Sequence, residues 1–345
     1  MRLSCICNMF RLTLPVISDR IYIDLTLHAQ NVRRIGECMY HIIINPHSCT
    51  GKGLRIWHKI KQELDRQSIE YKSYLTTHAG HGSELAKHIF YENDGILKLV
   101  IVGGDGTVNE VVNGIPEIER IHIGYIPAGS SNDLGRSLKL SKDPIENLNR
   151  ILHSTRIHLM DMGLAISPDK KLQNRFLVSS GLGYDASVCK EALRTPLKTF
   201  LNHIKLGKLT YILIALKQLF ARPFMEGAVS ADGSAFKSYK KLLLVTSMIQ
   251  KYEGGGMKMA PGADPNDGNL SICLVHGLSK LRVLTILPFL LVGKHTGFQG
   301  VETFDCRELT VKLAAPQVIH LDGECPGDFS AVTFTCFQNK VQLLQ

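Results

Sequence analysis

The sequence has no apolar run long enough to cross a bilayer and no cysteine pattern that would build a metal site. Its most apolar stretch, residues 283–293, is interrupted by Pro288, whereas a membrane span needs about 20 apolar residues. The nine cysteines are odd in number and include no Cys-x-x-Cys pair, which argues against a zinc site and a disulfide framework. We therefore expect a cytoplasmic protein with reduced thiols, in which residues 283–293 form a buried helix.

The sequence also has no internal repeat and no low-complexity segment. It lacks stretches that interleave basic with aromatic residues, so we expect no nucleic-acid partner. Hydrophobic residues make up 44% of the sequence and charged residues 21%, which is ordinary globular composition. A length of 345 residues favours two domains. The formal charge of +9 suits an anionic partner, such as a nucleotide or an acidic membrane surface.

Residues 1–38 contain short apolar runs that Pro15 and charged residues interrupt, unlike the continuous apolar core of a signal peptide. We treat them as an N-terminal extension. Because Met39 directly precedes the first expected strand, we hypothesise that the working protein starts there.

From residue 41 onward, short β-branched runs alternate with helical periodicity, which predicts an α/β domain with a parallel sheet at residues 39–160. The expected strands are 41–44, 71–75, 98–102 and 121–126, and the expected helices are 54–64, 83–90 and one from about 133. In the first helix Ile56, Trp57, Ile60 and Leu64 share one face, so Trp57 is expected in the core.

After residue 160 strand-like runs dominate, which predicts a mainly β second domain at 161–345 whose last segment can pack back on the first domain. The expected strands are 175–179, 241–248, 270–275 and 309–313. One clear helix interrupts them at 209–220 and ends before Pro223.

A glycine-rich loop follows the strand expected at 98–102. Gly104 and Gly106 let backbone N–H groups approach a phosphate closely, and a helix that begins near Val108 adds partial positive charge. Phosphate would repel Asp105 unless a divalent cation lay between them, so we assign Asp105 to Mg²⁺, directly or through water. The loop predicts a phosphate-binding site.

The other three strands of the parallel sheet also end in small or polar residues, and parallel sheets bind ligands at these carboxyl ends. The residues at these ends are Asn45, Pro46, His47, Ser48, Cys49, Thr76, Ser130, Asn132 and Asp133. One nucleotide can contact all four ends. For Asn132 and Asp133 a helix N-cap pair is an equal alternative.

Near the C-terminus, Asp322 and Glu324 flank Gly323. Two carboxylates at such a turn can provide a proton acceptor and its orienting or metal-binding neighbour, as activation of a substrate hydroxyl for phosphoryl transfer requires. An ordinary turn is the competing interpretation.

Together these segments resemble the soluble bacterial diacylglycerol kinases and YegS-like lipid kinases, whose catalytic domain is shared with eukaryotic diacylglycerol, sphingosine and ceramide kinases. The likeness runs from residue 40 to the end. The matching segments are Asn45-Pro46 with the turn at 48–53, the loop 103–107 with Asn109 and Glu110, Pro127-x-Gly129-Ser130-x-Asn132-Asp133 with Arg136, residues 254–257 with 260–268, and Asp322-Gly323-Glu324.

The resemblance implies a phosphofructokinase- or NAD kinase-like α/β domain followed by a β-sandwich that carries the catalytic base, with ATP in the cleft between them. It implies an ATP-dependent lipid kinase that most simply converts diacylglycerol to phosphatidic acid in phospholipid biosynthesis. Glu324 would be the general base, with Asp322 and Asp105 as further catalytic residues. The implied nucleotide contacts are Asn45, Pro46, His47, Ser48, Cys49, Thr76, Gly103, Gly104, Asp105, Gly106, Thr107, Val108, Asn109, Glu110, Ser130, Asn132 and Asp133.

A second, structural Mg²⁺ site is implied by the same resemblance at Asp264, Asp267 and Asn269, whose oxygen-rich spacing suits a hard cation. Three positions depart from the family pattern. Thr50 stands where several relatives carry Lys. Ser130 replaces Thr and keeps the hydroxyl. Cys49 replaces Gly, and its side chain would narrow the approach of the backbone to phosphate.

Residues 190–222 contain seven basic side chains and one acidic one, which suits peripheral contact with an anionic membrane. The basic residues are Lys190, Arg194, Lys198, Lys205, Lys208, Lys217 and Arg222. The alternative is that the helix at 209–220 packs on the sandwich while the lysines are solvated.

An NAD kinase-like enzyme and a catalytically silent lipid-binding regulator remain alternative functions. The exact acceptor is open among diacylglycerol, a sphingoid base, ceramide and phosphatidylglycerol, and a homodimer is open too.

Overall fold

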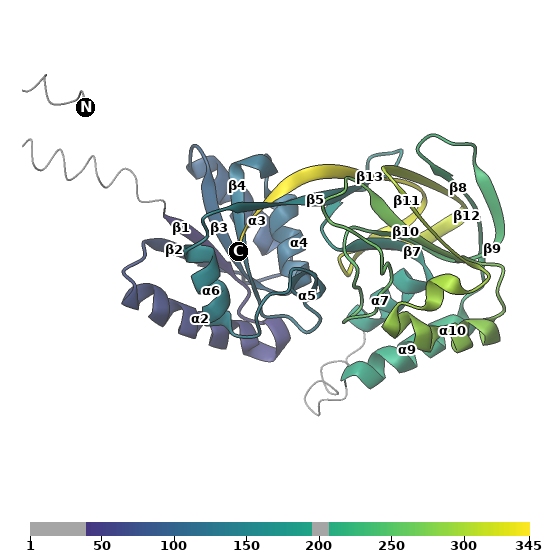
Figure 1. Cartoon of the computed structure of the whole chain (residues 1–345), viewed down its shortest axis with the longest axis horizontal. Coiled ribbons are helices and arrows are strands. Elements are labelled where there is room, and N and C mark those ends of the chain that lie inside the picture. The colour runs from purple at the N-terminus through teal and green to yellow at the C-terminus, as the bar shows by residue number, and fades with distance from the viewer. Residues whose placement is uncertain (1–38, 195–206) are drawn as a thin grey trace, which may run out of the picture. The chain divides into compact units, whose positions relative to one another are not determined.

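A computed structural model describes residues 39–194 and 207–345, without the side chains of 207–212 (Figure 1). The predicted N-terminal extension, together with Lys198 and Lys205 of the basic stretch, lies outside the described residues, and the side chain of Lys208 does as well. Within the described ranges no helix combines the length and apolar composition needed to cross a bilayer.

The first half of the described chain is a parallel sheet with helices on it, in the strand order β2-β1-β3-β4-β13. Its elements are β1 (Tyr40–Ile44), α2 (Ser48–Arg66), β2 (Tyr71–Leu75), α3 (His81–Glu92), β3 (Leu97–Gly103), α4 (Asp105–Gly114), η1 (Ile118–Arg120), β4 (Ile121–Pro127), α5 (Asp133–Ser137) and α6 (Pro144–Leu152). The apolar face expected for the first helix is buried, with Trp57 5% exposed. The predicted α/β arrangement is confirmed.

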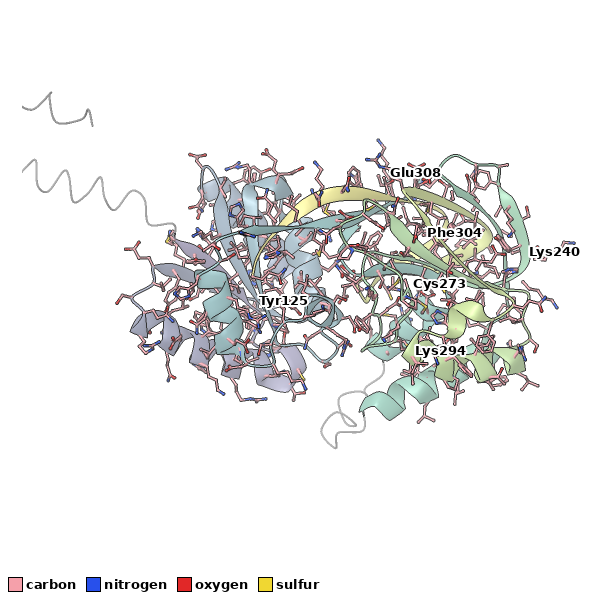
Figure 2. The ribbon with its side chains drawn as sticks, in the orientation of Figure 1. Tyr125, Lys240, Cys273, Lys294, Phe304 and Glu308 are labelled. Atoms are coloured by element: carbon pink, nitrogen blue, oxygen red, sulfur yellow. The ribbon has the colours of Figure 1, made fainter. Side chains whose placement is uncertain are left out.

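The second half is mainly β, in the order β11-β10-β9-β7-β12-β13. Its elements are β5 (Ile157–Ile166), β6 (Gln173–Phe176), β7 (Ser179–Gly183), α7 (Tyr184–Arg194), α9 (Gly207–Ala221), β8 (Met225–Ala231), β9 (Lys237–Met248), β10 (Leu270–His276), α10 (Lys280–Val292), η2 (His295–Gly297), β11 (Val301–Cys306), β12 (Glu308–Leu321) and β13 (Glu324–Leu344). Both β7 and β8 pair with β9 and β12, which closes the strands around an apolar core. Cys273 lies inside this half, whereas Lys240 and Glu308 lie at its periphery (Figure 2).

Strand β13 belongs to both halves. It begins beside β12, and its last residues pair with β4 and β5, with Leu343 opposite Ile123 on one side and His158 on the other. Leu343 and Val341 are buried in the same apolar cluster as the helices α3 and α4. Residues 39–345 consequently form one compact unit by their contacts.

The second half differs from the sequence expectations at three places. The strand expected at 175–179 is interrupted at Leu177 and Val178, because both N–H groups donate to the Asp322 carboxylate. Helix α7 was not expected, since its buried face uses small residues such as Ala186 and Ala192. Helix α10 is buried on one face only, and Leu291 on the other face is 61% exposed.

Candidate active site

The carboxyl ends of β1, β2, β3 and β4 lie at one edge of the parallel sheet, as the register of the strands requires. Ile44 is opposite both Leu75 and Val102, and Gly103 is opposite Pro127. The four predicted nucleotide-binding segments therefore meet at this edge.

The turn after β1 is tightly packed. The Asn45 side chain donates to Thr107 Oγ1 at 3.1 Å and accepts from the N–H of His47 at 3.0 Å. A Cβ atom at Gly53 would be 2.0 Å from the Asn45 carbonyl oxygen, so only glycine fits there. Cys49 lies exposed at φ +45°, in the left-handed region that a glycine would occupy without strain.

The loop after β3 contacts the turn after β4 and the C-terminal half. A Cβ atom at Gly104 would lie 3.1 Å from the Cα atom of Gly129. A Cβ atom at Gly106 would lie 2.7 Å from Glu324 Oε1. The glycine-rich loop and the predicted base, more than 200 residues apart in the sequence, are thus neighbours.

Both carboxylate oxygens of Asp105 already accept hydrogen bonds from the protein backbone. Its two carboxylate oxygens accept from the N–H groups of Asp133 at 2.9 Å and Leu134 at 3.3 Å, so it caps α5. Burial raises the pKa of Asp105 to about 6, although these two N–H groups act in the opposite direction. An aspartate held in this way can reach a cation through a bound water.

Three other residues that were predicted to contact the nucleotide make contacts within the protein. Val108 is buried in the core, and its N–H donates to the Gly104 carbonyl. The Glu110 carboxylate accepts from the N–H of Gly80 at 2.8 Å, which holds the start of α3. Asn109 donates to Asp322 at 2.9 Å. These contacts position the loop after β3 and the helix α4 against neighbouring segments of the chain.

Asp322 is an anchor for the turn that carries Glu324. Its carboxylate accepts from the N–H groups of Leu177, Val178 and Ser179 at 2.8 to 3.0 Å, in addition to the Asn109 amide. Burial raises the pKa of Asp322, while these hydrogen bonds lower it. Asp322 therefore orients the turn and is not open to substrate.

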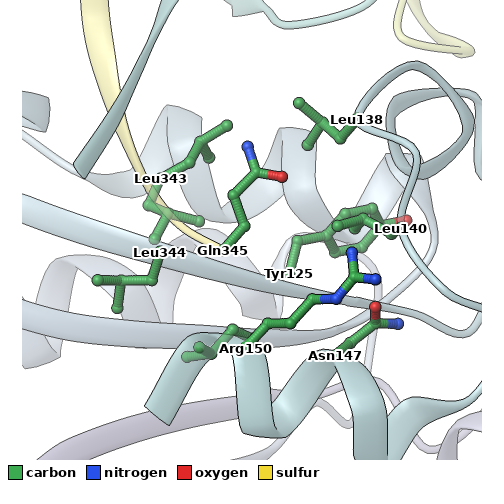
Figure 3. Close-up of a pocket in the computed structure, with 10 residues that line it drawn as sticks. Tyr125, Leu138, Leu140, Asn147, Arg150, Leu343, Leu344 and Gln345 are labelled. Carbon is green, nitrogen blue, oxygen red and sulfur yellow. The ribbon is translucent and has the colours of Figure 1, made fainter. Parts of the chain in front are cut away.

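A pocket of about 160 Å³ lies beside Glu324. It is lined by Asn109, Asn174, Leu321, Glu324, Cys325 and Pro326. Glu324 is exposed at the start of β13, so its carboxylate faces space that a substrate can enter. A smaller pocket of about 10 Å³, between β4, α6 and the C-terminus, contains none of the predicted site residues (Figure 3).

The turn after β4 also contacts the second half. Asp133 accepts from the N–H of Gly255 at 2.8 Å and forms an ion pair with Arg136. The Asn132 side chain bonds both the N–H and the carbonyl of Gly129 at 2.8 Å and does not cap the helix. Ser130 is exposed at the edge of the sheet, whereas Thr76 at the end of β2 is buried.

The predicted structural Mg²⁺ residues lie in one turn. Asp264 accepts from the N–H of Asn266 at 3.1 Å, and Asp267 accepts from the N–H of Asn269 at 2.9 Å. A further carboxylate, Asp161 on β5, accepts from the N–H of Gly268, and the charges of Asp267 and Asp264 add to burial in raising its pKa. Asp161 thus brings a third carboxylate to the side of this turn, and carboxylate oxygens are the ligand type that a hard cation takes. The sequence did not indicate Asp161 as a neighbour of this turn, because it lies about 100 residues earlier in the chain.

Comparison with known proteins identifies both halves. Residues 39–165 match the family model of the diacylglycerol kinase catalytic domain, and residues 178–345 match that of the YegS C-terminal NAD kinase beta sandwich-like domain. The chain is 31% identical to the "putative lipid kinase YtlR" of Bacillus subtilis (strain 168), over 84% of this chain and 94% of the relative. It is 26% identical to a diacylglycerol kinase of the same strain, over 84% and 91% of the two chains.

Among solved structures, a "putative diacylglycerol kinase" from Bacillus anthracis str. Sterne aligns with a TM-score of 0.69. The alignment covers 89% of this chain and 97% of the other, at 19% identity. This likeness shows the fold alone.

Proposed function

This chain belongs to the diacylglycerol kinase family of lipid kinases, and from that premise we propose that it transfers the γ-phosphate of ATP to the hydroxyl group of a lipid. The observation that carries the proposal is the close approach of Glu324 Oε1 to Gly106 in the glycine-rich loop. A carboxylate at this place can accept the proton of a lipid hydroxyl whose oxygen attacks a phosphate held by the loop. Both substrates would meet between an NAD kinase-like α/β domain and the β-sandwich.

Nucleotide binding would rest mainly on backbone N–H groups at the edge of the parallel sheet, in the turn after β1 and the loop after β3. Mg²⁺ bound with ATP would neutralise charge on the phosphates. Asp105 would hold it through water, because both of its oxygens already accept from α5. A second Mg²⁺ at Asp264, Asp267 and Asn269, next to Asp161, would be structural.

For the acceptor we propose diacylglycerol, which would give phosphatidic acid for phospholipid biosynthesis. The pocket beside Glu324 supports a lipid alcohol, since Leu321 and Pro326 line it together with the base. Pocket shape decides among lipid alcohols that would meet the same carboxylate.

We further propose that α9 and α10 dock on an anionic bilayer. Both helices lie next to each other, and the Lys280 ammonium donates to the carbonyls of Phe220 and Arg222 at the end of α9 (Figure 1). Their exposed apolar side chains are Leu213, Phe220, Leu281, Phe289, Leu291 and Val292. Exposed Arg282 and Lys294 flank the apolar side chains of α10. Apolar insertion and basic charge are the two signals that reversible membrane binding uses.

This proposal changes which basic residues matter. Lys190 and Lys217 of the predicted stretch form ion pairs with Asp328 and Glu191, at 2.7 and 2.6 Å. Arg282 in α10 and Lys294 just after its C-terminus were not predicted, because the sequence analysis expected residues 283–293 to form a buried helix.

The deciding experiment incubates the purified full-length chain with radiolabelled ATP and Mg²⁺ against mixed micelles of diacylglycerol, a sphingoid base, ceramide or phosphatidylglycerol. A parallel reaction contains NAD. We expect label in phosphatidic acid. Label in NADP would support an NAD kinase-like enzyme, and the absence of label in every product would support a silent lipid-binding regulator.

A further inference from the structure

Three side chains that commonly ligate metals meet in the second half of the chain. They are Asp185 at the start of α7, Glu253 in the loop after β9 and His320 near the end of β12. One ligand atom from each lies within 4.8 Å of those from the other two.

The spacing of these atoms matches coordination of one ion. His320 Nε2 is 3.1 Å from Asp185 Oδ2 and 3.1 Å from Glu253 Oε1. Nitrogen and oxygen ligands lie about 2.0 to 2.2 Å from a bound zinc ion, and tetrahedral ligands around it are about 3.4 Å apart. Ligands at right angles around an octahedral ion such as Mn²⁺ are about 3 Å apart.

The three side chains are largely buried, and each has one polar atom without a hydrogen-bond partner among the described residues. Asp185 is 7% exposed, Glu253 14% and His320 2%. Within the described part of the chain, Asp185 Oδ1, Glu253 Oε2 and His320 Nδ1 have no hydrogen-bond partner. No described lysine or arginine forms an ion pair with either carboxylate. Two buried carboxylates with one imidazole are costly without further positive charge.

The backbone around the cluster is built to leave room for it. Gly181 on β7 is so close that a Cβ atom would lie 1.7 Å from Asp185 Oδ2 and 2.8 Å from His320 Nε2. Any side chain at this position would displace two of the three ligand atoms.

We propose that Asp185, Glu253 and His320 bind one divalent transition-metal ion, zinc or manganese, at a site separate from both magnesium sites proposed above. An imidazole with two carboxylates suits these ions better than Mg²⁺ or Ca²⁺, which take oxygen ligands. The site does not depend on the proposed lipid kinase activity.

Such an ion would link α7 to two segments of the candidate active site. His320 precedes the Asp322 to Glu324 turn on β12, and Glu253 precedes Gly255, whose N–H donates to Asp133 at the nucleotide edge. The ion would therefore be structural. It would hold the turn at Asp322 to Glu324 at a fixed distance from the contact between Gly255 and Asp133.

The test uses the full-length chain, freed of metal with EDTA and kept reduced, in buffer with excess Mg²⁺ to fill oxygen-only sites. Mn²⁺ is the deciding probe, because thiolates such as Cys189 and Cys325 prefer zinc. The electron paramagnetic resonance signal of free Mn²⁺ is titrated with protein. We expect about one bound ion per chain and, at a hundredfold excess over Kd, a rise in Tm on the order of 5 °C.

Glu253→Gln and His320→Asn should each weaken Mn²⁺ binding at least tenfold. Glu302→Gln is the matched control, because Glu302 forms a similar half-buried pair with His276 at 2.7 Å but no third ligand has been found there among the described residues. It should bind Mn²⁺ like the parent chain. If His320→Asn does not fold, Glu253→Gln alone decides. Absence of bound Mn²⁺ in the parent chain, or unchanged binding in Glu253→Gln, would overturn the proposal.

Discussion

At the scale of single residues, the position of Glu324 allows the most direct test of the proposed chemistry. Its carboxylate borders both the glycine-rich loop and the pocket of about 160 Å³. Glu324→Gln keeps the shape and removes the proton acceptor, so we expect kcat to fall about 10²- to 10⁴-fold with little change in the KM for ATP. Steady-state kinetics with diacylglycerol micelles measures both constants.

Glu308→Gln provides the control for this substitution, since Glu308 is an exposed carboxylate at the periphery of the same half (Figure 2). It should keep the parent rate. A Glu324→Gln variant that does so too would remove Glu324 from the role of base.

Cys49 permits a prediction about stability. Its φ of +45° costs a residue with a side chain about 1 kcal/mol or more, and glycine avoids this cost. We expect Cys49→Gly to raise the free energy of unfolding by about 0.5 kcal/mol, because glycine also increases the entropy of the unfolded chain. Cys49→Ala retains the strain and should give no gain. Urea unfolding compares the three proteins, and equal stability of the two variants would refute the explanation.

Asp105 should make stability depend on pH. Burial raises the pKa of Asp105 from 3.8 to about 6, so the folded chain keeps this proton at pH values where the unfolded chain has lost it. The contribution to stability is therefore greatest below pH 4 and is lost as the pH rises through 6, by about 3 kcal/mol in total. Relative to Asp105→Asn, which lacks this titration, the parent chain should lose that free energy of unfolding between pH 4 and 7. If urea unfolding gave the parent chain and Asp105→Asn the same change in free energy of unfolding between pH 4 and 7, the raised pKa of Asp105 would be contradicted.

The residue types of the site could be predicted because they occur in local patterns, such as glycines after a strand or carboxylates around a turn. The residues that these side chains contact could not be predicted from the sequence. Asp322 accepts from N–H groups more than 140 residues earlier in the chain, and the cluster at Asp185 and His320 joins positions that are 135 residues apart. No local periodicity encodes such pairings, which arise only when the strands associate.

At the scale of secondary structure, strands and helices with strong periodicity could be predicted, whereas α10 shows the limit of composition. Its residues are apolar nearly all round, which predicts burial, yet Leu281, Leu291 and Val292 are exposed. Composition alone cannot distinguish a core helix from one with an uncovered apolar face, because the difference lies in what the rest of the chain leaves uncovered.

The exposed face of α10 leads to a prediction about membrane binding. The double variant Leu291→Ser and Val292→Ser removes apolar side chains that the bilayer would bury, so vesicle affinity should fall about tenfold or more. Sedimentation with phosphatidylcholine vesicles, with and without phosphatidylglycerol, measures it. Ile96→Ser is the control, since Ile96 is equally exposed, at 59%, in the first half. Equal loss in both variants, or binding that ignores anionic lipid, would exclude this surface.

At the scale of the whole molecule, the two family matches divide the chain near residue 170. Hydrogen bonds between strands nevertheless join the two matched regions. The long strand β13 starts at Glu324 and ends between β4 and β5, so the parallel sheet of the first half is completed by the C-terminus. The sequence predicted that the last segment can pack back on the first domain, but the apolar alternation of 341–344 does not specify which strand it joins.

This topology predicts that the two halves unfold together. Deletion of residues 341–345 removes the buried side chains of Val341, Leu343 and Leu344 and leaves β4 without a partner on one side. Three buried aliphatic side chains contribute about 2 kcal/mol each, so the free energy of unfolding should fall by about 5 kcal/mol or more. In the parent chain, urea unfolding followed by Trp57 fluorescence in the first half and by circular dichroism of the strands should give one coincident transition. Two separate transitions, or a truncated chain as stable as the parent, would show that β13 does not couple the halves.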